Sequence, residues 1–148
     1  MTMSTDTDIL EYMPDLLDYG IQDFSADHAK SRLDILRRLR IEWWPKLQPW
    51  KNDIRYVNSY AEMDEDLLTE SQFTRSAVFH VLSYYILPKL AKFNPDGDRF
   101  ENMMKHFHNR FEEEINLVMK DGVEYDLNND NVVDTGEKLP RDFGRLVR

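Results

Sequence analysis

The stretch NPDGDRFENMMKHFHNRFEEEINLVMK, residues 94–120, decides the fold. Its large apolar residues recur at spacings of three or four, the repeat that places side chains on one face of an α-helix. They are Phe100, Met104, Phe107, Phe111, Ile115 and Val118. Asn94 is suited to cap the helix and Pro95 to occupy its first position, while Gly122 is suited to end it. The pattern predicts one amphipathic helix that runs to Lys120.

A first helix is expected earlier in the chain, where Ser25 is a good N-cap and Pro45 stops the helix. Between these two residues the apolar positions again recur at spacings of three or four. They are Ala29, Leu33, Leu36, Leu39 and Trp43. This stripe predicts a helix that buries one face against the rest of the domain.

A second helix is expected after Thr69 and Gln72, whose spacing is that of a capping box. The segment that follows is the most apolar of the chain, and Pro88 ends or kinks it. Its main stripe is Phe73, Ala77, Val81 and Tyr84. His80 lies within this helix, where we expect a hydrogen-bonded core or boundary histidine in preference to a metal ligand.

Residues 1–24 predict an extended N-terminal arm or short helical pieces, because proline and glycine interrupt their apolar pattern. The apolar residues of this segment need cover from the domain or from a neighbouring subunit. Residues 45–66 predict a connector with little regular structure. Three tryptophans lie in or beside it and either close the core or belong to an interface. They are Trp43, Trp44 and Trp50.

Together these patterns predict a mainly α fold. We expect a three-to-four-helix bundle domain over residues 25–120 and an extended N-terminal arm over residues 1–24. An acidic loop and a basic, extended C-terminal arm are expected over residues 121–148. At 148 residues the chain is long enough to bury a real core in one domain.

Composition narrows the classes of function. The net charge of −9 argues against general nucleic-acid binding, which needs lysine and arginine for phosphate contacts. The lack of cysteine excludes disulfides, thiolate zinc sites and a cysteine nucleophile. No apolar run approaches the roughly 20 residues that span a bilayer, and the N-terminus lacks the features of a secretory signal. We therefore expect a cytoplasmic chain without membrane contact. The sequence carries no common catalytic motif, and we expect no enzyme activity.

The segment DLNNDNVVDTGE, residues 126–137, has the ligand spacing of an EF-hand calcium loop. A hard cation such as Ca²⁺ takes six to eight oxygens at roughly 2.3–2.6 Å, which a short chain supplies from alternate residues. Five candidate ligands act through side chains and Val132 through its backbone carbonyl. The set is Asp126, Asn128, Asp130, Val132, Asp134 and Glu137. The sixth position, usually glycine, is Asn131, which also tolerates the positive φ expected there.

A solvated turn is the alternative interpretation of this loop, because Asp and Asn also hydrogen-bond to their own backbone. The flanks depart from a complete EF-hand. Gly122 ends the preceding helix four residues before the loop, and Pro140 prevents a long exiting helix. With a single loop of this kind, we expect a bound ion to be structural and not the ion of a calcium sensor.

Residues 138–148 are basic, partly apolar and too short to fold alone. A frayed end is one interpretation. The other is a docking peptide that becomes ordered on a partner's groove or acidic surface. Its candidate contact residues are Arg141, Phe143, Arg145, Leu146, Val147 and Arg148.

Several segments resemble tailed-bacteriophage head-to-tail adaptor proteins. They are KDGVEYDLNND (residues 120–130), GRLVR (144–148), DYGI (18–21) and RIEWWP (40–45). The resemblance covers both ends of the chain and its first helix. It implies a structural protein of the virion neck, assembled in the cytoplasm of the infected bacterium, that forms a dodecameric ring beneath the portal.

The resemblance also implies roles for segments and partners. Residues 25–120 would form the ring, and residues 138–148 would reach up to the portal protein. A downstream neck or tail-terminator protein would bind the ring, and DNA would pass through its lumen without sequence-specific binding. A net charge of −9 is compatible with such a conduit, because a negative lumen does not hold the duplex. The calcium-type loop is not expected in every adaptor and would stiffen the hinge of the arm.

Three other interpretations stay open. Another neck or tail-completion protein would differ from an adaptor in ring stoichiometry and portal binding. A soluble calcium-binding module would change its helices when calcium binds. A small helical enzyme would need a pocket with convergent titratable groups.

Overall fold

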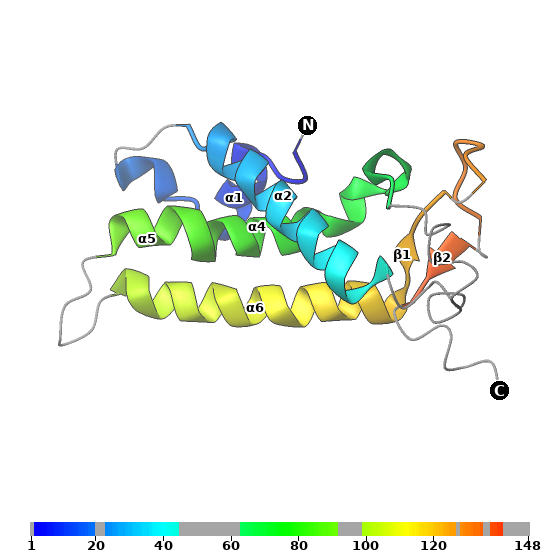
Figure 1. Ribbon diagram of the computed structural model, residues 1–148. Helices are drawn as coiled ribbons and strands as arrows, with labels where there is room; N and C mark the ends of the chain where they lie inside the picture. The colour runs from blue at the N-terminus through cyan, green and yellow to red at the C-terminus, as the bar shows by residue number, and fades with distance from the viewer. Residues whose placement is uncertain are drawn as a thin grey trace. The chain divides into compact units, whose positions relative to one another are not determined.

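The computed structural model describes residues 2–19, 23–44, 63–91, 99–126, 128–134 and 137–140 (Figure 1). These residues are mainly helical, with one small two-stranded sheet, which confirms the expected fold class. The chain divides into two compact units. Unit 1 comprises Met1–Asp34 and Phe73–Ile115, and unit 2 comprises Ile35–Gln72 and Asn116–Arg148.

In unit 1 the N-terminal segment folds into two short helices, α1 (Asp6–Tyr12) and η1 (Leu16–Tyr19). A capping box starts α1: the Thr5 hydroxyl oxygen accepts from the Asp8 backbone N–H, and the Asp8 carboxylate accepts from the Thr5 backbone N–H. Ile9 is fully buried, and α1 contacts α4. The described part of this segment therefore forms short helical pieces, one of the two expected structures, and its apolar side chains find cover in the same chain.

The apolar second helix of the sequence is one continuous helical rod with a change of pitch. It consists of α4 (Thr74–Val81), the π-helical η6 (Leu82–Ile86) and α5 (Leu87–Leu90) (Figure 1). Pro88 has no N–H and cannot continue the α-helical hydrogen bonds, so the turn before it widens into a π-helix. Pro88 thus neither ends the rod nor leaves it regular.

The long helix α6 (Arg99–Asp121) agrees with the predicted amphipathic pattern. In unit 1 the first part of α6 lies alongside α4 and α5, where Phe79 and Phe107 stack at a centroid distance of 6.0 Å (Figure 1). Phe111 and Ile115 continue the buried face. The expected start at residues 94–95 lies outside the described residues.

Helix α2 (Ser25–Glu42) starts at Ser25, but its cap is supplied by the residues before it. The Ser25 N–H donates to Asp23 Oδ1 at 2.9 Å, and the Phe24 carbonyl accepts the first helical bond, from His28. The hydrogen bonds from Ser25 lower the pKa of Asp23.

The predicted apolar stripe of α2 is correct only in its second half. Leu36, Leu39 and Trp43 are buried, whereas Ala29 is exposed and Leu33 is 59% exposed. In unit 1 the buried face of α2 is polar instead, because its side chains pair with polar groups of other segments. The members of this buried polar face are Asp27, His28, Ser31 and Arg32.

Unit 2 contains a short antiparallel hairpin of β1 (Val123–Glu124) and β2 (Lys138–Leu139). Trp43 is fully buried, and its Nε1–H donates to the Leu139 carbonyl at 2.8 Å. Trp43 therefore belongs to the core, one of the two places expected for the tryptophans. Trp50 lies outside the described residues.

Short helical turns of unit 2 lead toward the hairpin. η4 (Glu65–Leu67) and η5 (Glu70–Phe73) precede α4, and Leu68 forms a β-bridge with Tyr125. The predicted capping box at Thr69 and Gln72 was wrong. The Gln72 carboxamide pairs with the backbone of Glu124 in β1, accepting from its N–H at 3.3 Å and donating to its carbonyl at 3.4 Å.

Candidate metal centre

The hairpin brings the two ends of the calcium-type loop together. Asp126, the first loop residue, follows β1, and Glu137, the twelfth, directly precedes β2. The Tyr125 N–H donates to the Glu137 carbonyl at 3.1 Å, and the Asp126 N–H donates to the Leu67 carbonyl at 3.0 Å. The backbone positions of the first and last candidate ligands are therefore held by the strand pairing beside them.

Three of the predicted ligands converge. Carboxylate oxygens of Asp126, Asp130 and Glu137 all lie within 4.8 Å of one another. The Asn128 side chain joins this group: its Nδ2 donates to Asp130 Oδ2 at 3.2 Å. Asp134, the fourth carboxylate of the predicted ligand set, is not part of this group.

The other two predicted ligands are placed through their backbones. The Val132 N–H donates to Asp130 Oδ1 at 2.9 Å, and the Asp134 N–H donates to Glu137 Oε1 at 3.3 Å. The Val132 side chain is 58% exposed, as expected if this residue acts through its carbonyl.

Hydrogen bonds from the loop backbone orient the acidic side chains. Asp126 accepts from the N–H groups of Asp130 and Asn131 at 3.2 and 2.8 Å, through its two carboxylate oxygens. Asn131 has φ +67°, which confirms the positive φ expected at the sixth position. Asn129 also has positive φ, +56°. These turns bring backbone N–H groups to the Asp126 carboxylate.

The electrostatics of the cluster favour a cation. Asp126 and Glu137 are each only 7% exposed. No described residue forms an ion pair with either of them. The neighbouring Lys138 is engaged elsewhere, 2.8 Å from Asp121, whose hydrogen bond and charge raise the pKa of Lys138. Backbone N–H groups donate to both carboxylates, and a Ca²⁺-type ion is the kind of further partner that suits such oxygens.

The flanks of the loop are strands in place of the helices of an EF-hand. Gly122 ends α6 with φ +124°, and its N–H donates to the Val118 carbonyl at 3.0 Å. The predicted helix end is therefore confirmed. β2 begins at Lys138, so residues 138–139 belong to the hairpin and not to a free arm. The six predicted arm contacts, Arg141, Phe143, Arg145, Leu146, Val147 and Arg148, lie outside the described residues.

The two buried histidines lie in unit 1 and serve its packing. His80 is 5% exposed, with Nδ1 2.8 Å from Ser31 Oγ, as expected of a hydrogen-bonded core histidine. His28 lies between Ser4 Oγ, 2.6 Å from Nδ1, and Asp6 Oδ1, 2.9 Å from Nε2. Ser4 is only 2% exposed, and this chain of polar groups anchors the N-terminal segment within unit 1.

Sequence patterns did not indicate these pairings, since the residues are far apart along the chain. A further pairing joins Lys89 Nζ to Asp27 Oδ2 at 2.7 Å. Tyr85 donates a hydrogen bond to Asp34 in the same unit, and burial together with this bond raises the pKa of Tyr85 to about 12. The sequence contained one indication of these pairings: Asp27 and Ser31 lie four residues apart, on one face of α2.

None of the described helices combines the length and the apolarity that a membrane span requires. Comparison of the chain with protein-family models, curated proteins and solved structures found no match.

Proposed function

We propose that the chain is a structural virion protein, a head-to-tail adaptor that forms a ring under the portal and joins the DNA-filled capsid of a tailed bacteriophage to its tail. The observation that carries this proposal is the resemblance of KDGVEYDLNND (residues 120–130), GRLVR (144–148), DYGI (18–21) and RIEWWP (40–45) to such proteins. The mainly helical fold agrees with the ring-forming bundle that the resemblance implies.

Physical features of the chain support this role. The net charge of −9 suits a conduit that DNA passes without adhering. Large apolar side chains stand exposed on helices, Leu33 and Tyr84 in unit 1 and Ile41 and Leu117 in unit 2, with exposed fractions of 46–63%. Each of these side chains is a candidate for contact with a neighbouring copy. Many weak repeated contacts suffice in a ring, because multivalency adds to their strength.

The test is to measure the mass of the purified chain and to image it by negative stain, alone and with a portal protein of a tailed phage. We expect a ring, or a ring formed on the portal. Deleting residues 141–148 should abolish portal binding and leave the fold intact, because β2 ends at Leu139. Lys120→Gln is the matched control, since it removes one exposed positive charge outside the arm.

A chain that stays monomeric and ignores the portal would overturn the adaptor proposal. A ring that binds the end of a tail, and not a portal, would assign the chain to the other neck and tail-completion proteins. These outcomes separate the two virion roles by partner.

A second function, binding of one structural calcium ion, is favoured by a specific observation: oxygens of Asp126, Asp130 and Glu137 lie within 4.8 Å of one another. The ion would supply the positive charge that the two buried carboxylates lack among the described residues. Ligands from both ends of the loop would then tie β1 to β2. Such an ion would stiffen the point from which the C-terminal residues leave the hairpin.

Titration calorimetry with calcium chloride tests this second function. We expect one ion per chain, and Glu137→Gln should weaken binding by about tenfold or more, because it removes one carboxylate oxygen and its charge. Glu113→Gln is the matched control, since Glu113 is an exposed acid on α6. Absence of binding heat, or equal affinities for the two variants, would contradict a calcium site in this loop.

A further inference from the structure

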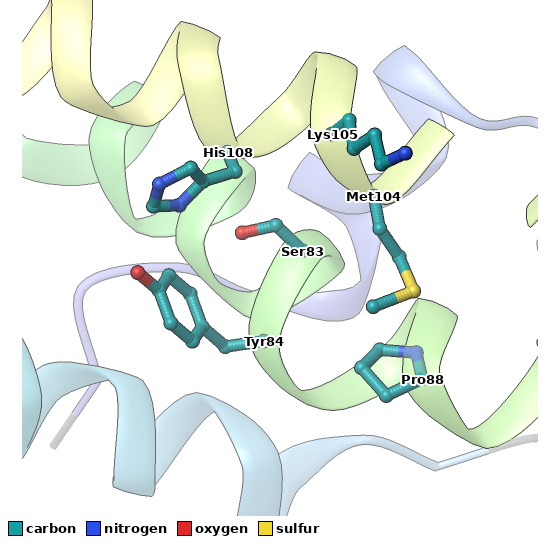
Figure 2. A pocket seen from close by; sticks show the side chains of 6 residues that line it. All are labelled: Ser83, Tyr84, Pro88, Met104, Lys105 and His108. Atoms are coloured by element: carbon teal, nitrogen blue, oxygen red, sulfur yellow. The ribbon is translucent and has the colours of Figure 1, made fainter. Parts of the chain in front are cut away.

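Unit 1 contains a pocket beside the π-helical turn, which we call the π-helix pocket. Its volume is about 330 Å³, and its lining is mainly apolar. Figure 2 shows its walls coming from two helical segments, η6 with the start of α5 on one side and α6 on the other. The lining residues are Ser83, Tyr84, Pro88, Met104, Lys105 and His108. Ligand pockets span about 300–1,000 Å³, so this one suits a single large side chain.

The π-helical turn leaves a hydrogen-bond acceptor on Ser83, one of the residues that line this pocket. In a helix the Ser83 carbonyl would accept from the N–H of residue 87 or 88. The Leu87 N–H instead donates to Leu82, five residues back, and Pro88 has no N–H. The Ser83 carbonyl is therefore without a donor in its own helix, and a ligand that carries an O–H or N–H group would supply one.

The rim of the π-helix pocket is basic. Lys105 is exposed and forms no ion pair with any described residue. His108 stands at the same side of the pocket, edge-on to the Tyr84 ring at 5.5 Å (Figure 2). The pocket thus favours an aromatic group with a hydroxyl, next to a negative charge.

Helix α1 of the same unit presents a group of this kind. Tyr12 is 38% exposed, and its ring is held edge-on against Phe79 at 5.1 Å. The adjacent Glu11 is exposed and forms no ion pair within the described part of the chain. The ring of Tyr12 matches the apolar lining of the pocket, and its hydroxyl group is a donor for the Ser83 carbonyl. The Glu11 carboxylate matches the positive charge of Lys105.

The two surfaces lie on different flanks of α6. Arg110 lies over the ring of Phe79 at 5.3 Å and so marks the flank near Tyr12. Lys105, on the pocket side, is five residues earlier, which is roughly 140° around the helix. One copy of the chain cannot bring its own Tyr12 to its own pocket without unfolding. Complementary surfaces on different flanks join neighbouring copies head to tail, the arrangement that closes into rings.

We propose that Tyr12 and Glu11 of one copy dock at the π-helix pocket of the next, with Glu11 paired to Lys105 and the Tyr12 ring against Met104 and Pro88. This contact adds detail to the proposed adaptor function. As a contact between the subunits of a ring, it rests on that proposed function.

Cysteine cross-linking tests the contact directly, because the chain contains no cysteine. Glu11→Cys and Lys105→Cys are prepared separately in the full chain, mixed, and oxidised. We expect a disulfide-linked pair of the two variants. Lys120→Cys, at another exposed lysine of α6, replaces Lys105→Cys in the control and should give far less linked product. Equal yields for the two mixtures, or no linked pair in either, would overturn the contact.

Charge reversal provides the second measurement. Glu11→Lys and Lys105→Glu should each weaken self-association by about tenfold or more, since each places like charges together. The double variant should restore association, which a change that merely damages the fold would not do. Mass measured over a range of concentrations supplies the readout.

The outcomes distinguish this contact from the adaptor function. If the chain is monomeric at all concentrations yet binds the portal, the contact is contradicted. The adaptor function would still be supported. The chain could also assemble and cross-link from residue 11 to residue 105 without binding the portal. That result would support the contact and contradict the adaptor function.

Discussion

The indole of Trp43 joins helix α2 to the last strand of unit 2 through a single hydrogen bond, from Nε1 to the Leu139 carbonyl at 2.8 Å. Trp43→Phe keeps an aromatic ring but removes this donor and leaves the carbonyl unsatisfied in a buried place. We expect a loss of about 1–3 kcal/mol in the free energy of unfolding, measured by urea denaturation. Leu117→Ala, at a 58% exposed side chain, should change it by less than about 0.5 kcal/mol and serves as the control. Equal losses would show that the hydrogen bond contributes little.

Tyr85 makes the stability of unit 1 sensitive to alkaline pH. Burial disfavours the phenolate, and the hydrogen bond to Asp34 exists only while the phenol is protonated, so the pKa rises from 10.0 to about 12. A group with a raised folded-state pKa contributes stability that is present below pH 10 and is lost as pH rises toward about 12. Tyr85→Phe should therefore flatten the fall in unfolding free energy over this range. If the unfolding free energies of the variant and the wild-type chain fall in parallel with rising pH, Tyr85 is not the cause of the alkaline loss of stability.

Single residues with local causes were predictable. Asn131 was expected to adopt positive φ, and it has φ +67°. The role of His80 as a hydrogen-bonded core residue was also predicted, but its partner Ser31 was not. A helical position reveals on which face a side chain lies, whereas its partner depends on a segment 49 residues away.

At the scale of elements, the junction of α6 and the hairpin depends on Gly122. A Cβ atom there would lie 2.7 Å from the Lys138 Cγ and 3.2 Å from the Lys138 carbonyl, and φ is +124°. We expect Gly122→Ala to destabilise the chain by about 1–3 kcal/mol, because an alanine at this positive φ is strained even if the neighbouring side chains move away. Thermal unfolding followed by circular dichroism measures this loss.

Adding Lys138→Ala to that variant is the informative control for Gly122. It removes the Cγ contact but leaves the backbone contact and the φ angle, so only part of the stability should return. Full recovery would mean that side-chain crowding, and not the backbone conformation, makes glycine necessary at this junction.

The helical rod of α4, η6 and α5 illustrates how an element differs from its sequence pattern. Pro88 predicted an end or a kink. The helix does not end there but widens into a π-helix and continues to Leu90. The rod persists because side chains directly before the proline are fully buried, among them Leu82, Ile86 and Leu87. This packing outweighs one lost hydrogen bond, and the same turn creates the wall of the π-helix pocket.

For the whole molecule, calcium should stabilise the chain without refolding it. The described residues of the hairpin and its loop are joined by backbone hydrogen bonds, so we expect an ion to add cross-links to this arrangement. At a calcium concentration of 100 times Kd, the gain would be about 2.7 kcal/mol. Thermal unfolding should shift upward with calcium while the far-ultraviolet circular dichroism at room temperature stays constant. A large rise in helix content on adding calcium would favour a calcium-responsive module instead of a structural ion.

The sequence by itself determined the features whose causes are local along the chain. The spacing of Phe107, Phe111 and Ile115 predicted a buried helical face, and Gly122 predicted its end. The oxygen spacing of residues 126–137 predicted four carboxylate ligands, of which three lie together. Each follows from the period of one helix or from the stereochemistry of one short loop, and needs no knowledge of a neighbour.

Only the tertiary structure decided which groups pair across the chain. Leu33 is exposed and Asp27 buried on the same helix because Lys89 lies opposite Asp27. Gln72 pairs with β1 instead of capping a helix. The free energy of a buried polar group depends on the partner that the fold brings to it, and residues dozens of positions apart leave no periodic trace of that partner in the sequence.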